Sequence, residues 1–199
     1  MSKPLQIGVT GGIGSGKSII CRLFSCLDIP VYGADARAKW LTNHHPGIRE
    51  QVTALLGTAA YDMSGRYDTA YVASKVFKDE VLLQKLNSII HPVVMEDTAQ
   101  WVRANAAYPY LIKEAAIMNK AGDGNTLDYV IVVEAPENLR ISRILMRDRR
   151  SEEEIRAIIR RQVSDDQRRN MADFIIKNDD VTALIPQVMH LHRYFRSKT

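Results

Sequence analysis

The sequence has few cysteines, few aromatic residues and no long apolar run. Although 46% of its 199 residues are hydrophobic, no stretch is apolar over the length that a membrane-spanning helix needs, so we expect no membrane partner. The two cysteines, Cys21 and Cys26, are spaced neither as a C-x-x-C pair nor as a zinc site. We expect both to be reduced cysteines in the core of a cytoplasmic protein. The segment Met1–Pro4 runs directly into a first strand, which predicts that no signal peptide is present.

The most basic segment of the chain lacks lysine and aromatic residues. The net charge is +4 and the pI is near 9.1, yet the segment from Arg140 to Arg169 contains ten arginines, no lysine and no aromatic residue. This segment lacks the stacking surface of proteins that bind single-stranded nucleic acid, so we expect no nucleic-acid partner. Arg140, Arg143 and Arg147 share one face of a helix. We assign phosphate binding to Arg143 and Arg147, because a guanidinium fork matches phosphate oxygens. Surface pairing with glutamate is expected for Arg149, Arg150, Arg156 and Arg161.

The most specific motif is a glycine-rich segment near the N-terminus. Residues 11–18 read G-x-x-x-x-G-K-S, directly behind the apolar run Leu5–Val9 and ahead of apolar residues at helical spacing. Such a loop turns its backbone N–H groups around a β-phosphate, and the following helix adds the positive end of its dipole. Lys17 is expected between the β- and γ-phosphates, and the Ser18 hydroxyl on Mg²⁺. The motif predicts binding of a nucleoside triphosphate.

Apolar runs and helical patterns alternate along the chain, which predicts an α/β fold with a parallel sheet flanked by helices. Most expected strands are continuous apolar runs, typical of parallel strands buried on both faces. They are Leu5–Thr10, Pro30–Gly33, Tyr110–Glu114, Tyr129–Glu134 and Phe174–Lys177. The expected helices are Lys17–Leu27, Ala70–Phe77, Leu82–Ile90, Val93–Asn105, Glu137–Arg147, Glu152–Val163 and Val181–Tyr194. Pro92 is expected to break the helical pattern, and Asp68, Asp79 and Ser151 to cap three helices.

The long helical insert from about Arg37 to Tyr108 is too large for a simple crossover, so we interpret it as a substrate-binding lobe. Motifs of other nucleotide-binding classes are missing. The segment Asn119–Gly122 lacks the final Asp of the guanine-binding pattern N-K-x-D, and the second signature loop of a transport ATPase does not occur. A short chain with a helical insert and an arginine-rich helix fits a kinase of a small metabolite.

Several segments together resemble the dephospho-CoA kinase family. They are Val9–Ser18, Val31–Asp35, Ile89–Pro92, Pro136–Asp148 and Ala172–Asn178, and they occur in that family's order and spacing over nearly the whole chain. The resemblance implies a P-loop nucleotide kinase fold that transfers the ATP γ-phosphate to the ribose 3′-hydroxyl of dephospho-CoA, the last step of coenzyme A biosynthesis. It also implies a single domain with a core (1–36, 109–140 and 172–199), a helical CoA lobe (about 37–108) and a lid (about 141–171).

The motif and the resemblance together assign the site residues. ATP is expected on Gly12, Ile13, Gly14, Ser15, Gly16, Lys17, Ser18, Ile19, Arg147 and Asn178, with Mg²⁺ on Ser18. Substrate contacts are expected from Thr10, Asp35 and His91. The expected catalytic residues are Lys17, Asp35, Glu114 and Arg143. Four of these residues have structural alternatives: Asp35 as a helix N-cap, His91 as a helix cap, Glu114 as an ordinary charge at a strand end, and Asn178 as a turn residue.

The sequence departs from the family pattern at three places. The family's D-x-D after the second strand is Gly33-Ala34-Asp35 here, so the acid usually assigned to polarising the acceptor hydroxyl is missing. Asp35 or Glu114 must then do that work, unless Asp35 is only a helix N-cap. After Glu114, the third-strand motif lacks the family's proline and final acid. In the helical insert, Thr69 stands where an arginine often follows the aspartate that is Asp68 here.

Three functions are therefore carried forward. The first and favoured one is dephospho-CoA kinase. The second is a kinase of the same fold with another small-metabolite acceptor, which the departures allow. The third is a catalytically weak nucleotide-binding or regulatory protein. In each case we expect a cytoplasmic monomer.

Overall fold

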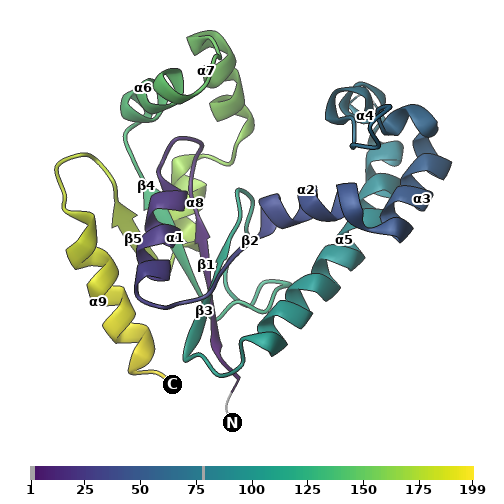
Figure 1. Cartoon of the computed structure of the whole chain (residues 1–199). Helices are drawn as coiled ribbons and strands as arrows, with labels where there is room; N and C mark the ends of the chain where they lie inside the picture. Colours follow the sequence, from purple (N-terminus) through teal and green to yellow (C-terminus); the bar gives the residue numbers. More distant parts are fainter. Residues whose placement is uncertain (1–2, 78) are drawn as a thin grey trace. The chain divides into compact units, whose positions relative to one another are not determined.

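The computed structural model describes residues 3–77 and 79–199, which form two compact units (Figure 1). One unit holds the chain up to Gly33 and again from Asn105 onward, and the other holds Ala34–Ala104. The phosphate-binding motif lies in the first unit.

A five-stranded parallel sheet forms the centre of the first unit. Its strands are β1 (Leu5–Thr10), β2 (Val31–Gly33), β3 (Tyr110–Glu114), β4 (Tyr129–Glu134) and β5 (Phe174–Lys177), in the order β2-β3-β1-β4-β5. All pairings are parallel. The sequence prediction is confirmed for every strand, with the one difference that β2 begins at Val31 rather than Pro30. Because the strands are parallel, their carboxyl ends meet at one edge, where the phosphate-binding loop also begins.

Helices cover both faces of this sheet. On one face, α1 (Lys17–Cys26) and α9 (Leu184–Arg196) enclose a core that includes Ile7, Phe24, Tyr110 and Phe195, all fully buried. On the other face, α8 (Asp165–Met171) packs beside β4. Between β4 and α8 the chain forms α6 (Glu137–Arg147) and α7 (Glu152–Arg161), which share a small isoleucine core. These two helices therefore reach the strand edge that carries the loop.

The second unit is entirely helical. It contains α2 (Ala34–His44), α3 (Pro46–Leu56), the short 3₁₀ turn η1 (Thr58–Ala60), α4 (Thr69–Val76) and α5 (Glu80–Ala104). Its core is formed by apolar residues of all these elements, among them Leu41, Ile48, Val72 and Leu86. As predicted, Asp68 caps α4 by accepting the Tyr71 N–H. In the described part of the chain, no helix is both long enough and apolar enough to cross a bilayer.

The structure corrects two sequence predictions, on Pro92 and on Cys26. Pro92 does not break the helical pattern but lies inside α5, where Ile89, Ile90 and Val93 keep packing on the core. The carbonyl that proline leaves without its helical partner belongs to Ser88, which is exposed to water. Cys26 is exposed rather than part of the core, whereas Cys21 is buried as expected.

Two helices were not predicted, and a third begins earlier than expected. Helix α3 has His45 as N-cap and proline at its first position, and α8 has a capping box made by Ser164 and Gln167. Both signals are visible in the sequence. Helix α2 begins at Ala34, so Asp35 lies in its first turn and is not its N-cap.

Candidate phosphate-binding site

The phosphate-binding loop connects β1 to α1 and can be built only with glycine at two positions. Gly14 and Gly16 have left-handed backbones, with φ of 77° and 93°. A Cβ on Gly14 would lie 2.7 Å from the Arg140 carbonyl oxygen, and one on Gly16 would overlap the Asn178 side-chain amide. Gly16 is also the N-cap of α1 and makes no side-chain cap. No N-cap side chain therefore occupies the N-terminus of α1, where the helix dipole favours an anion.

The two side chains that the motif assigns to phosphate and metal lie at the start of α1. The Lys17 ammonium donates to the Gly11 carbonyl oxygen at 2.9 Å and to that of Gly12 at 3.3 Å. It therefore lies across the mouth of the loop. Ser18 is exposed one residue further on, so its hydroxyl can reach a metal ion held by bound phosphates. The donor set fits a Mg²⁺ nucleotide, because this ion takes few protein oxygens and completes its shell with phosphate and water.

Asn178 fixes the far side of the loop. It follows β5, is 5% exposed, and its side-chain amide donates to the Ser15 carbonyl oxygen at 2.8 Å. Its backbone N–H donates to the Glu134 carbonyl oxygen at 2.8 Å, continuing the β4–β5 ladder. Asn178 is therefore a structural partner of the loop, and more than a turn residue.

Arg143 and Arg147, which the sequence treats alike, have different surroundings. The Arg143 guanidinium donates to the Asn178 backbone and side-chain oxygens at 3.1 and 3.2 Å, and pairs with Asp180. It also reaches the Gly14 carbonyl oxygen at 3.5 Å. Arg147 is 64% exposed and pairs with its neighbour Asp148, a hydrogen bond that lowers the pKa of the Asp148 carboxyl. The structure thus brings Arg143 to the loop and leaves Arg147 on the helix surface.

Glu114 ends β3 beside the loop. In the sheet register it lies opposite Val9 of β1 and Gly33 of β2. Burial and then the nearby Glu114 carboxylate raise the pKa of the Cys21 thiol to about 12, so the thiol stays protonated and donates a hydrogen bond to that carboxylate. The missing family aspartate would stand at Gly33, directly beside Glu114. The paired ends of β2 and β3 therefore carry one acid instead of two.

The remaining predicted residues lie as follows. Thr10 is buried at the end of β1, where its hydroxyl donates to the Ala116 carbonyl oxygen at 3.4 Å. Ile19 is 49% exposed on α1. Asp35 and His91 belong to the second unit, Asp35 in the first turn of α2 and His91 on the exposed side of α5.

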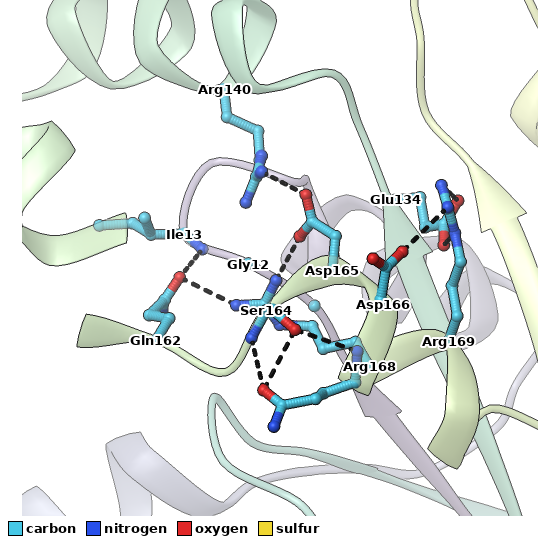
Figure 2. Close-up of polar contacts among 12 residues, drawn as sticks. Gly12, Ile13, Glu134, Arg140, Gln162, Ser164, Asp165, Asp166, Arg168 and Arg169 are labelled. Carbon is cyan, nitrogen blue, oxygen red and sulfur yellow. Dashed lines mark hydrogen bonds and ion pairs between the residues drawn. The ribbon is translucent and has the colours of Figure 1, made fainter. Parts of the chain in front are cut away.

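Sequence reasoning assigned no role at the loop to Arg140, Gln162 or Arg168, whose side chains contact it from α6, from the segment before α8 and from α8 (Figure 2). The Gln162 side-chain oxygen accepts the Ile13 N–H at 2.9 Å, and the Ile13 side chain packs on the core of α6 and α7. The Arg140 and Arg168 guanidinium groups approach Gly12. No local pattern indicates these contacts, because the partners are more than 100 residues apart in the chain.

A cavity of about 300 Å³ adjoins this side of the loop. Gly12 and Ser15 line it, together with the residues that follow β4 and charged side chains of α6 and α8. Lys17 and Ser18 are not among its lining residues. The cavity is therefore distinct from the mouth of the loop.

A parallel sheet with a glycine-rich loop leading into α1, a lysine across the loop mouth and an acid on the adjacent strand end defines a P-loop kinase. A model of the dephospho-CoA kinase family matches residues 5–183. The dephospho-CoA kinase of Porphyromonas gingivalis is 37% identical over 198 residues, which cover 98% of this chain and 96% of that protein. This chain belongs to the dephospho-CoA kinase family.

Solved structures show the same fold. A protein from Thermus thermophilus superposes with a TM-score of 0.83 at 26% identity, over 99% of this chain and 98% of that one. The structure of dephospho-CoA kinase from Campylobacter jejuni superposes with a TM-score of 0.62 at 20% identity, over 98% of both chains. The P-loop kinase fold expected from the sequence is thus confirmed.

Proposed function

We propose that this chain transfers the γ-phosphate of ATP to the ribose 3′-hydroxyl of dephospho-CoA, giving coenzyme A and ADP. The observation that carries the proposal is the placement of Glu114 at the carboxyl end of β3, beside the loop whose mouth Lys17 spans. A phosphate donor and an acidic group that can orient an acceptor hydroxyl therefore meet at one sheet edge. Membership of the family identifies the acceptor.

Residues 12–19 would bind the triphosphate, with part of the contacts made by backbone N–H groups of the loop; the Ile13 N–H is already donated to Gln162. Lys17 exchanges its two carbonyl contacts for the β- and γ-phosphates, and Arg143 adds a guanidinium from α6. The Ser18 hydroxyl would hold Mg²⁺ together with the phosphates, and the ion would supply neutralisation of the charge that develops during transfer. The acceptor oxygen bonds to the γ-phosphorus while the bond from that phosphorus to the β,γ-bridging oxygen breaks, and the hydroxyl proton passes to a carboxylate or to water.

Glu114 and Asp35 are the proposed partners of the acceptor hydroxyl. Glu114 ends β3, and Asp35 follows directly on β2. A second carboxylate at Gly33 would repel Glu114, so its absence leaves Glu114 as the single negative group on that strand pair. Because phosphoryl transfer depends mainly on positioning and charge stabilisation, one well-placed acid is sufficient.

The helical unit 34–104 is the proposed CoA lobe, with His91 as a substrate contact, and Thr10 contributes at the start of the loop. The proposed lid is the segment of about 141–171. Most arginines of that segment are already paired with carboxylates, for example Arg156 with Glu137 and Glu152, which supports the absence of a nucleic-acid partner. We further infer a cytoplasmic monomer.

The test is a coupled assay with purified protein, Mg-ATP and dephospho-CoA, run beside a panel of other hydroxyl acceptors. Coenzyme A formation is expected only with dephospho-CoA, and chelation of the metal should abolish it until Mg²⁺ is restored. Phosphorylation of another acceptor in preference to dephospho-CoA would overturn the proposal.

A second comparison tests which of the two acids, Glu114 and Asp35, contributes to turnover. Glu114→Gln and Asp35→Asn should each lower turnover by roughly tenfold or more without unfolding, since each keeps the size and hydrogen bonding of the side chain. The matched control is Glu134→Gln, which alters an acid at the end of β4 that is paired with Arg169. If Asp35→Asn keeps full turnover, Asp35 is not a catalytic residue and Glu114 acts alone.

A further inference from the structure

Arg140 is a buried cation that the proposed chemistry does not use. It lies in α6, its side chain is 3% exposed, and its guanidinium donates to the Asp165 carboxylate at 2.8 Å. The same carboxylate accepts a hydrogen bond from Arg168, whose side chain is 7% exposed (Figure 2). One carboxylate therefore serves two buried guanidinium groups, which leaves a net positive charge in the cluster.

This cluster lies directly against the phosphate-binding loop. A Cβ on Gly12 would overlap the Arg140 guanidinium and would come within 3.4 Å of that of Arg168. The Gln162 side-chain oxygen accepts both the Ile13 N–H at 2.9 Å and an Arg168 N–H at 3.4 Å. Gly12 and Ile13 are therefore contacted by side chains of α6, of α8 and of the segment between α7 and α8.

Stability alone does not account for this arrangement. A buried charge costs free energy unless it is fully paired and hydrogen-bonded. The Arg140 Nε has no hydrogen-bond partner, and the partner that Arg140 does have is shared with a second cation. Burial, and to a smaller extent Arg140 itself, lowers the pKa of Arg168. An anion bound on the other side of Gly12 would relieve this excess of positive charge.

We propose that Arg140 is a positioning residue of the phosphate-binding loop. Asp165 holds its buried positive charge against Gly12, and this charge strengthens binding of the ATP triphosphate by the loop. The inference rests on the ATP-binding part of the proposed function and is independent of the acceptor. Arg140 acts through the loop backbone and does not touch the nucleotide.

The test compares Arg140→Met, which removes the charge and keeps an unbranched side chain, with Arg140→Lys, which keeps the charge. Calorimetry measures the Kd for ATP, and thermal unfolding measures the Tm. Arg140→Met is expected to weaken ATP binding about tenfold, as one unit charge about 10 Å away would do at an effective dielectric constant of about 20. Its Tm should stay unchanged or rise, because Asp165 keeps Arg168 as a partner and a poorly paired buried charge is gone.

Arg140→Lys should restore most of the ATP affinity. The matched control is Arg156→Met, which removes a half-exposed arginine paired with Glu137 and Glu152 and should leave the Kd for ATP unchanged. A residue that served only the packing of α6 would show the opposite result, a lower Tm with an unchanged Kd. Should Arg140→Met fail to fold, Arg140→Gln provides the neutral variant.

Two outcomes overturn the inference: a neutral variant that binds ATP as tightly as the natural protein, or Arg140→Lys that binds as weakly as the neutral variant. Failure of the proposed function is distinguishable, because ATP binding is measured without an acceptor. A protein that binds ATP but does not phosphorylate dephospho-CoA would leave this comparison valid.

Discussion

Replacing Asn178 with alanine should weaken both the fold and the binding of ATP. The side chain is buried, and it is the donor that satisfies the Ser15 carbonyl oxygen at 2.8 Å. It also accepts a hydrogen bond from Arg143 at 3.2 Å. Asn178→Ala therefore removes one partner from each of two polar groups, and it leaves Gly16 without the neighbour that fills the space over its Cα.

The expected magnitude follows from the group that loses its donor. A buried carbonyl left without a hydrogen bond costs about 1–3 kcal/mol, and this sets the expected loss in the free energy of unfolding. Part of this free energy also weakens ATP binding, because ATP must bring the loop of the variant back into the conformation that Asn178 holds in the natural protein. If all of it returns, the Kd for ATP rises by roughly five- to hundredfold.

Urea denaturation with and without saturating ATP measures both effects, and calorimetry gives the Kd. The matched control is Asn119→Ala, which removes an exposed asparagine whose amide donates to the Asp123 carbonyl oxygen at 3.4 Å. It should change the free energy of unfolding by no more than about 0.5 kcal/mol. If Asn178→Ala is as stable as this control and binds ATP with unchanged affinity, Asn178 does not hold the loop and the reasoning is refuted.

Three further outcomes are expected. Lys17→Ala should keep the fold and lower turnover by roughly two to three orders of magnitude in steady-state kinetics, and an unchanged kcat would show that this loop is not the catalytic one. Arg143→Lys should lower turnover more than Arg156→Lys, because of these two arginines only Arg143 places its guanidinium at the loop. Equal effects would mean that the arginines contribute only positive charge to the surroundings of the loop. In the native protein a thiol reagent should modify the exposed Cys26 rapidly and Cys21 only on unfolding, because burial keeps the Cys21 thiol protonated, with its pKa raised to about 12. Two fast thiols per chain would contradict this placement of Cys21.

Local patterns in the sequence determined the sheet and most helices. β4 is apolar up to its last residue because both faces of the sheet are covered, so its bounds follow from composition alone. The phosphate-binding loop was equally predictable, since its glycines, Lys17 and Ser18 are consecutive in the chain. Helix α8 could have been found from its Ser164 capping box, a signal that was present but not used.

Other features depended on contacts that no local pattern contains. A proline predicts a helix break, yet α5 continues through Pro92 because the apolar residues on both sides of it are buried in the same core. In the same way, Cys21 and Cys26 look alike in sequence, and only the packing of α1 against the sheet buries one and exposes the other.

The site shows the same division between sequence and tertiary structure. Asn178 reaches Ser15 because β5 pairs with β4 and β4 with β1, so that two strand registers bring the ends of β5 and β1 together. Arg140 and Gln162 reach the loop because α6 and the segment before α8 return to the carboxyl edge of β1. The sequence by itself determined which atoms can bind phosphate, since that chemistry is local to eight consecutive residues. Tertiary structure alone decided which distant side chains hold those atoms in place, because strand pairing and helix packing join residues that are far apart in the chain.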